Sequence, residues 1–377
     1  MAFDLSKLSP AEQEKILSGP ALPPPENAES NFDNPPNRSI IPEAVIPICL
    51  ILVISTLLLR AYSRFVVLKT VRLGDLLIFL AFVTYVGYIY CIYDVVRDVG
   101  FFVHQWNITV RHMSDVQYIL HIGAGFYTFT LLFSKAAILL QWLEIFSPKG
   151  THRPFFWICH ILLWINILFY VSALVAGNLI CMPFQRIYDK TVAGYCWNGR
   201  PLNLAIGSFN VISDFLLLLL PQRAIWTLNM PTKKKAGIAL IFAIGIIACA
   251  SASLRLGLTV GYSTDPDWLY RVAGLSMGCV VEMTCILLVY CMPGIPAAFK
   301  NSTILGTFFR SFRSSLRSIS RLRSRSGSVS NMSGHDAKKH SRQDGWQEME
   351  LDQISVGQAH PAGVYPEESV ERLQARV

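Results

Sequence analysis

The chain has 377 residues, of which 52% are apolar and only 15% are charged, and its formal net charge is +8. Soluble domains carry about 25% charged residues, so this composition excludes an ordinary soluble protein and indicates an all-α protein embedded in a membrane. Apolar segments take up so much of the chain that we expect no separate soluble catalytic domain.

Residues 1–40 form a polar, proline-rich segment that precedes the first apolar run. Pro23–Pro25 stand among acidic residues and asparagines, and such a composition builds no core, so the segment is predicted to be disordered. Within it, Ser9-Pro10-Ala11-Glu12 predicts one short helix with Ser9 as its N-cap. No short apolar stretch follows a basic start, so we expect no cleaved signal peptide.

Seven apolar segments follow, separated by short polar loops. About 20 mostly apolar residues are enough to cross the roughly 30 Å hydrocarbon core of a bilayer. The segments cover 41–62, 73–95, 118–146, 155–180, 202–228, 236–262 and 272–299. They predict a bundle of seven transmembrane helices over residues 41–300. Pro221 in the fifth segment and Pro293 and Pro296 in the seventh are expected to bend or break their helices.

The charges of the loops alternate, and this alternation predicts the orientation of the chain. One set of loops carries the basic residues at 60–72, 149–153 and 233–235 and the arginine-rich tail, whereas the 263–271 loop holds Asp265 and Asp267. Basic loops stay in the cytoplasm. The N-terminus is therefore predicted to lie outside the cell and the C-terminus in the cytoplasm, in a multi-pass protein of the plasma membrane.

Two of the nine cysteines, Cys181 and Cys196, flank a loop that this orientation places outside, whereas the other seven lie within the apolar segments. An oxidising compartment permits a disulfide between them. A disulfide that closes a loop of this length lowers the entropy of the unfolded chain and would stabilise the folded protein by about 3 kcal/mol. The two sequons on the same side, at Asn37 and Asn107, are candidates for N-glycosylation.

Four ionisable residues lie deep within the apolar segments, and such residues are costly there unless they serve a function. They are Lys135, Asp214, Arg255 and Glu282. At 1.5 Å per residue, Arg255 and Glu282 come out at roughly 10 and 15 Å below the outer surface, and Asp214 and Lys135 at roughly 20 and 25 Å. Each oppositely charged pair is therefore predicted to meet. The pairs either fasten helices together or line a ligand pocket, and the sequence leaves both interpretations open.

The sequence contains no recognised cofactor site. A retinal Schiff base of the opsin kind needs a lysine in the seventh segment, which has none before Lys300. His121 and His160 lie near opposite ends of neighbouring segments, so they do not share a haem iron. Metal-binding His-Glu-x-x-His, nucleophile-elbow and phosphate-loop motifs are missing. We therefore expect neither a cofactor nor a metal, and no recognised catalytic constellation supports an enzyme.

The C-terminal part divides into a basic segment, 301–326, and a polar tail, 327–377, that is predicted to be disordered in the cytoplasm. Phe308, Phe312 and Leu316 recur at helical spacing among the arginines of Arg310–Arg325. This pattern predicts an amphipathic helix that binds the anionic lipids of the inner leaflet. Next to a membrane span the leaflet is the nearer partner, so we expect no binding to nucleic acid.

An ordered set of motifs resembles the fungal rhodopsin-domain family of integral membrane proteins over about residues 45–300. In chain order they are Ser134-Lys135, Cys181-Met-Pro183, Tyr188-Asp189, Gly194-Tyr-Cys196, Asp214 to Pro221, Ile225-Trp226-x-Leu228, Ser253-Leu-Arg255-Leu256, Glu282 and Cys291-Met-Pro293. Gly100 and His104 resemble the outer segment of that family. Glu144 departs from its pattern, which often has an arginine before the closing Ile-Phe.

The resemblance implies a fungal, receptor-like protein with seven helices, of the kind linked to surface sensing, while other members are associated with secondary-metabolite gene clusters. We expect it to sense an extracellular small molecule or surface cue through a pocket near Arg255 and Glu282, and to signal to a cytoplasmic protein by helix rearrangement. The alternative is a membrane-embedded enzyme or carrier that acts on a secondary metabolite.

Overall fold

The computed structural model describes residues 9–26, 29–147, 153–189, 191–226, 232–262 and 266–294. The predicted basic segment 301–326, with Arg310–Arg325, and the tail 327–377 lie outside the described residues.

Within the described residues, seven helices are long and apolar enough to cross a membrane, which confirms the predicted fold class. They are α2 (Ile40–Tyr62), α3 (Leu73–Asp98), α4 (Val110–Phe146), α5 (Arg153–Asn178), α6 (Gly199–Trp226), α7 (Thr232–Tyr262) and α8 (Trp268–Cys291). A π-helical turn, Ser63–Leu68, extends α2, and a 3-10 turn, Met292–Gly294, follows α8.

The largest differences from the predicted segments are eight residues, at the start of α4 and at the end of α8. α4 begins at Val110 rather than at 118, because the side chain of Thr109 accepts a hydrogen bond from the backbone N–H of His112 and caps a polar first turn. α8 ends at Cys291, two residues before Pro293, which has no N–H to continue the helical hydrogen bonds. Pro221 does not end α6, which runs on to Trp226.

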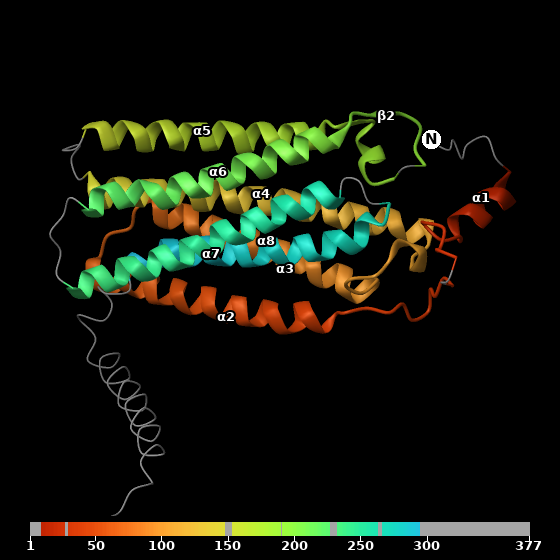
Figure 1. The fold of residues 1–377 in the computed structure, drawn as a ribbon, viewed down its shortest axis with the longest axis horizontal. Coiled ribbons are helices and arrows are strands. Elements are labelled where there is room, and N and C mark those ends of the chain that lie inside the picture. The colour runs from red at the N-terminus through yellow and green to blue at the C-terminus, as the bar shows by residue number, and fades with distance from the viewer. Residues whose placement is uncertain are drawn as a thin grey trace, which may run out of the picture. The chain divides into compact units, whose positions relative to one another are not determined.

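The centre of the bundle is formed by α4 and α8. In their most apolar windows 61% and 56% of the residues are buried, against 22–39% in the other five spans. Figure 1 shows α5 along one side of the bundle and α2 along the other, with α4 and α8 between them. The fully buried Leu131 and Met283 belong to the core that these two helices share.

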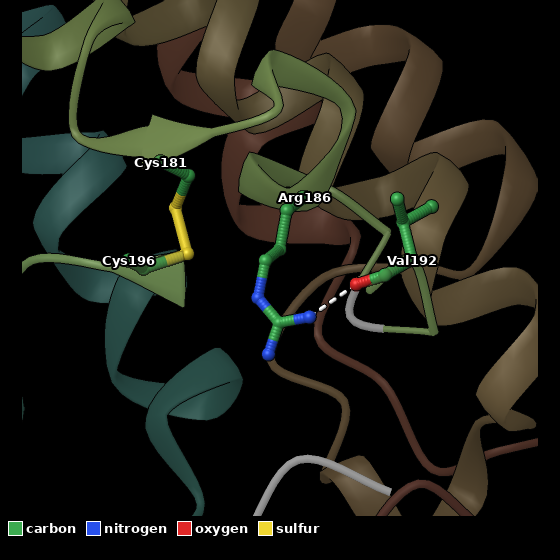
Figure 2. The surroundings of a disulfide bond; sticks show 4 residues. All are labelled: Cys181, Arg186, Val192 and Cys196. Atoms are coloured by element: carbon green, nitrogen blue, oxygen red, sulfur yellow. Dashed lines mark hydrogen bonds between the residues drawn. A yellow bond between two sulfur atoms is a disulfide. The ribbon is translucent and has the colours of Figure 1, made fainter. Parts of the chain in front are cut away.

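One end of the bundle carries a short hairpin, and we call it the hairpin end. Strands β1 (Cys181–Met182) and β2 (Tyr195–Cys196) pair antiparallel, with Cys181 opposite Cys196, and the two cysteines form the predicted disulfide. Within the loop, Arg186 donates to the carbonyl of Val192 (Figure 2). The structure requires glycine at 194, because a Cβ there would lie 2.3 Å from the carbonyl oxygen of Met182.

The N-terminal segment contains the short helix predicted from Ser9, α1 (Pro10–Leu17). The hydroxyl and the N–H of Ser9 both donate to Glu12, and these bonds lower the pKa of the Glu12 carboxyl. Figure 1 shows α1 at the hairpin end. The N–H of Ala21 donates to the carbonyl of Ile108 at 2.8 Å, so the segment is joined to the loop before α4. Disorder of residues 1–40 stays a prediction.

Candidate functional site

The four ionisable residues predicted within the spans form two ion pairs at the centre of the bundle. Nζ of Lys135, on α4, lies 2.8 Å from Oδ1 of Asp214 on α6. Nε of Arg255, on α7, lies 3.2 Å from Oε2 of Glu282 on α8. Their exposed fractions range from 0% to 6%. The pairing inferred from depth along the spans is therefore present.

Asn210 of α6 joins the two pairs into one network. Its side-chain oxygen accepts a hydrogen bond from Lys135 at 2.7 Å, and its amide nitrogen donates to Oε1 of Glu282. The side chain is completely buried. Lys135 and Glu282 therefore interact through one neutral amide.

Two tyrosines and a serine add further hydrogen bonds to this network. Tyr127 of α4 donates to Oε2 of Glu282 at 3.0 Å, and Tyr170 of α5 donates to Oδ1 of Asn210 at 2.9 Å. Ser213 accepts from Lys135 at 3.3 Å and donates to Asn166 at 2.9 Å. Five helices, α4 to α8, thus contribute to one buried polar cluster, which we call the core network.

The neutral members of the core network were not predicted, because uncharged polar side chains occur in many membrane helices. A spacing signal was present in the sequence. Asn210 precedes Asp214 by four residues, which places both side chains on one face of α6. An amide one helical turn from a buried carboxylate can form hydrogen bonds to the same side chains as the carboxylate, as Asn210 and Asp214 do with Lys135.

A cavity of about 980 Å³ lies at the hairpin end of the bundle and is lined by parts of α3 to α8. Aliphatic and aromatic side chains make up most of its wall. Its polar lining includes Tyr88, Tyr127, Arg255, Thr259 and Ser276. Arg255 is the one member of the four predicted pocket residues that lines this cavity. Lys135, Asp214 and Glu282 are connected to it through Arg255 and the core network.

The guanidinium of Arg255 is incompletely bonded. Its Nε binds Glu282, and its Cζ lies 5.1 Å from the centre of the Tyr127 ring. Its Nη2 is buried and has no hydrogen-bond partner among the described residues. A buried donor left without an acceptor costs about 1–3 kcal/mol. The cavity wall and the core network therefore share Arg255, whose guanidinium has one buried donor without an acceptor.

A second charged cluster lies at the opposite end of the bundle. Asp75 of α3 is bound by Arg60 at 3.1 Å and by Arg64 at 3.4 Å, and it accepts from the hydroxyl of Tyr290 on α8 at 3.0 Å. Arg60 also donates to the backbone carbonyl of Tyr290 at 2.8 Å. Glu144 of α4 lies 2.8 Å from Arg72 and 3.5 Å from Arg64. This opposite-end cluster fastens α2, α3, α4 and α8 together.

The loop before α4 is fastened to the start of α8 by His104. Its Nδ1 lies 2.5 Å from Oδ2 of Asp267, and its ring is stacked between Trp106 and Tyr270. A second cavity, of about 780 Å³, is lined by these residues and by Leu22 of the N-terminal segment. His104 is thus a structural residue of the hairpin end.

The two predicted glycosylation sites differ in exposure. Asn37 is exposed, whereas Asn107 is only 5% exposed and accepts a hydrogen bond from the backbone N–H of Asn31 at 3.1 Å. A glycan on Asn107 would displace the N-terminal segment from its place on the loop.

Residues 59–301 match the fungal rhodopsin domain. The chain belongs to the fungal rhodopsin domain family. A relative from Gibberella zeae, "Fugralins biosynthesis cluster protein 2", is 36% identical over 78% of this chain and 74% of its own length. A "SAT4 family membrane protein" of Emericella nidulans is 30% identical over 60% of this chain and 54% of its own. "Wortmanamides biosynthesis cluster protein C" of Talaromyces wortmannii is 25% identical over 45% of this chain and 46% of its own length. No solved structure matches this fungal rhodopsin domain protein.

Proposed function

We propose that this membrane protein is a receptor-like sensor that binds an extracellular small molecule in the hairpin-end cavity and signals by a rearrangement of its helices, without retinal. The observation that carries the proposal is the contact between the cavity and the core network at Arg255. A ligand that binds the guanidinium changes the strength of the ion pair between Arg255 and Glu282. Because α4 to α8 all contribute side chains to the core network, such a change affects the packing of five helices at once.

Helix α8 supplies a route from the cavity to the other end of the bundle. It carries Glu282 in the core network and, eight residues later, Tyr290 in the opposite-end cluster, which is about 12 Å along the helix axis. Between them, Thr284 shares a hydrogen bond of 2.8 Å with Tyr85 of α3. A ligand that favours one packing of α8 would shift the population of the state in which the opposite-end cluster is closed.

The proposal includes an orientation and a location. The hairpin end faces the outside of the cell, the protein is in the plasma membrane, and the opposite end meets a cytoplasmic signalling protein. The oxidised pair Cys181–Cys196 supports this orientation, since disulfides persist in oxidising compartments. The basic segment Arg310–Arg325 would then meet anionic lipids of the inner leaflet.

A complemented deletion strain tests the receptor proposal. The double variant Arg255→Gln/Glu282→Gln removes the pair without leaving one charge unpaired, and Arg97→Gln, at an exposed arginine of α3, is the matched control. We expect the double variant to reach the membrane at the normal level but to lose transcriptional responses to surface and nutrient cues. Unchanged responses with a folded double variant would refute the sensor.

A second candidate function is an enzyme or carrier for a secondary metabolite, and the names of two relatives, both biosynthesis cluster proteins, support it. Metabolite profiling of the deletion strain against its parent separates the two functions. An accumulated intermediate that disappears on complementation supports the enzyme or carrier. An unchanged metabolite profile with altered responses supports the sensor.

A further inference from the structure

We propose that the hairpin-end cavity takes a largely apolar molecule that places an uncharged hydrogen-bond acceptor, such as the carbonyl of an ester, ketone or amide, against the guanidinium of Arg255. This inference rests on the proposed ligand-binding function and specifies the chemistry of the ligand.

The first step of the argument concerns the unbonded donor. Nη2 of Arg255 has no hydrogen-bond partner among the described residues, although the residue is only 6% exposed. Arg255 lines the cavity, and its Nε already binds Glu282 at 3.2 Å. Buried polar groups are rarely left without partners in native structures. Nη2 itself is enclosed, so an acceptor in the cavity would reach it after a small turn of the side chain, and the bond from Nε to Glu282 would remain.

The second step concerns charge. The core network contains two cations, Lys135 and Arg255, and two anions, Asp214 and Glu282, which neutralise one another. A ligand carboxylate bound to Arg255 would add a third buried anion next to Glu282 with no cation to balance it. Burying an unbalanced charge is expensive. A neutral carbonyl supplies the missing acceptor and leaves the network uncharged.

The third step concerns size and the rest of the wall. A volume of about 980 Å³ lies at the upper end of the range of small-molecule sites, which extends over about 300–1,000 Å³. The wall near Arg255 includes Tyr88, Tyr127 and Cys279, and farther toward the hairpin it includes Phe102, Phe184 and Trp268. These side chains suit an apolar body of considerable length. Arg200, which is exposed and also lines the cavity, is where an anionic group would bind instead.

Three matched fluorescent probes test this inference on the purified full-length protein in lipid nanodiscs. Each contains dimethylaminonaphthalene, and the three carry a methyl ester, a carboxylic acid or neither group. Empty nanodiscs correct for probe in the lipid. We expect the ester to bind about tenfold more tightly than the unsubstituted probe, the gain of about one hydrogen bond to a charged donor, and more tightly than the acid.

Substitutions at glycines distinguish a failure of the inference from a failure of the proposed function. A Cβ at Gly177, which lines the cavity, would meet no atom within 4 Å, so Gly177→Leu fills cavity space without a clash of the Cβ. Gly257 on α7 is equally open but is not a lining residue, so Gly257→Leu is the matched control. We expect only Gly177→Leu to weaken ester binding, by at least tenfold.

The ester preference should also disappear in Arg255→Gln/Glu282→Gln. Since the comparison of the three probes uses the wild-type protein, the test does not depend on the folding of that variant. Equal binding of the three probes, or tighter binding of the acid, with a persisting effect of Gly177→Leu would overturn the uncharged acceptor but keep the cavity as a binding site. Binding no greater than that of empty nanodiscs, or unaffected by Gly177→Leu, would overturn the binding function itself.

Discussion

At the scale of single residues, Asn210 is the member of the core network whose loss has the widest effect. Its side chain accepts from Lys135 and Tyr170 and donates to Glu282, and no water is at hand to replace it because the residue is completely buried. Each polar partner left unbonded in such a place adds its own desolvation cost.

We therefore predict that Asn210→Leu, which keeps the branched shape and the number of side-chain heavy atoms, lowers the free energy of unfolding by about 1–3 kcal/mol for the partners left unbonded. Thermal unfolding in detergent, followed by the fluorescence of a thiol-reactive dye, measures the effect. Asn34→Leu, at an exposed asparagine of the N-terminal segment, is the control and should change stability by no more than about 0.5 kcal/mol. Equal melting temperatures for the two variants would contradict the role of Asn210.

The sequence predicted the charged half of the core network but not its neutral half. Asp214 and Glu282 stand out in the sequence because a carboxylate is costly within a spanning segment unless it has a function. The rise per residue of a helix then gives the depth of each carboxylate in the membrane. Asn210, Tyr127 and Tyr170 carry no such signal. Which of them bonds to a carboxylate depends on the rotation of each helix about its axis, and that rotation follows from packing in the bundle.

At the scale of helices, the opposite-end cluster joins α2, α3 and α8 through one carboxylate. Asp75 binds Arg60, Arg64 and Tyr290, and Cys291 is fully buried beside Tyr290 at the end of α8. The thiol of Cys291 therefore reports whether the ends of these helices are packed together.

We predict that Asp75→Asn, which removes the charge that holds two arginines, makes Cys291 react with maleimide at least several-fold faster. Peptide mass spectrometry after timed labelling measures the rate at each cysteine separately. Asp115→Asn, at an exposed carboxylate of α4, is the matched control. If Cys291 stays as unreactive in Asp75→Asn as in the control, the cluster does not keep the end of α8 closed.

Hydropathy predicted the existence of every spanning helix, and its largest errors, of eight residues, lie at the start of α4 and at the end of α8. The first turns of α4 are polar, so an apolar pattern cannot detect them, and the hydroxyl of Thr109 sets the start of the helix. α8 ends before the apolar segment does, because Pro293 interrupts the backbone hydrogen bonds. Backbone hydrogen bonding, which hydropathy does not measure, decides both boundaries.

At the scale of the whole molecule, the hairpin and the N-terminal segment share one end of the bundle, so they lie on the same side of the membrane (Figure 1). We predict that an epitope tag at the N-terminus is accessible to antibody on intact protoplasts and that a tag at the C-terminus requires permeabilised cells. The basic loops and the Cys181–Cys196 disulfide support this orientation. Staining of the C-terminal tag on intact cells would contradict this orientation and place the C-terminus outside the cell.

The balance of charge in the core network also has an electrical consequence. Moving one elementary charge through the membrane field is worth about 2.3 kcal/mol per 100 mV. Lys135 and Asp214 cancel, and so do Arg255 and Glu282, so a helix movement that carries each pair as a unit transfers no net charge across the field. We therefore expect the membrane voltage to have little influence on the conformation of the bundle, so that the proposed response to a ligand would be equal in depolarised and polarised cells.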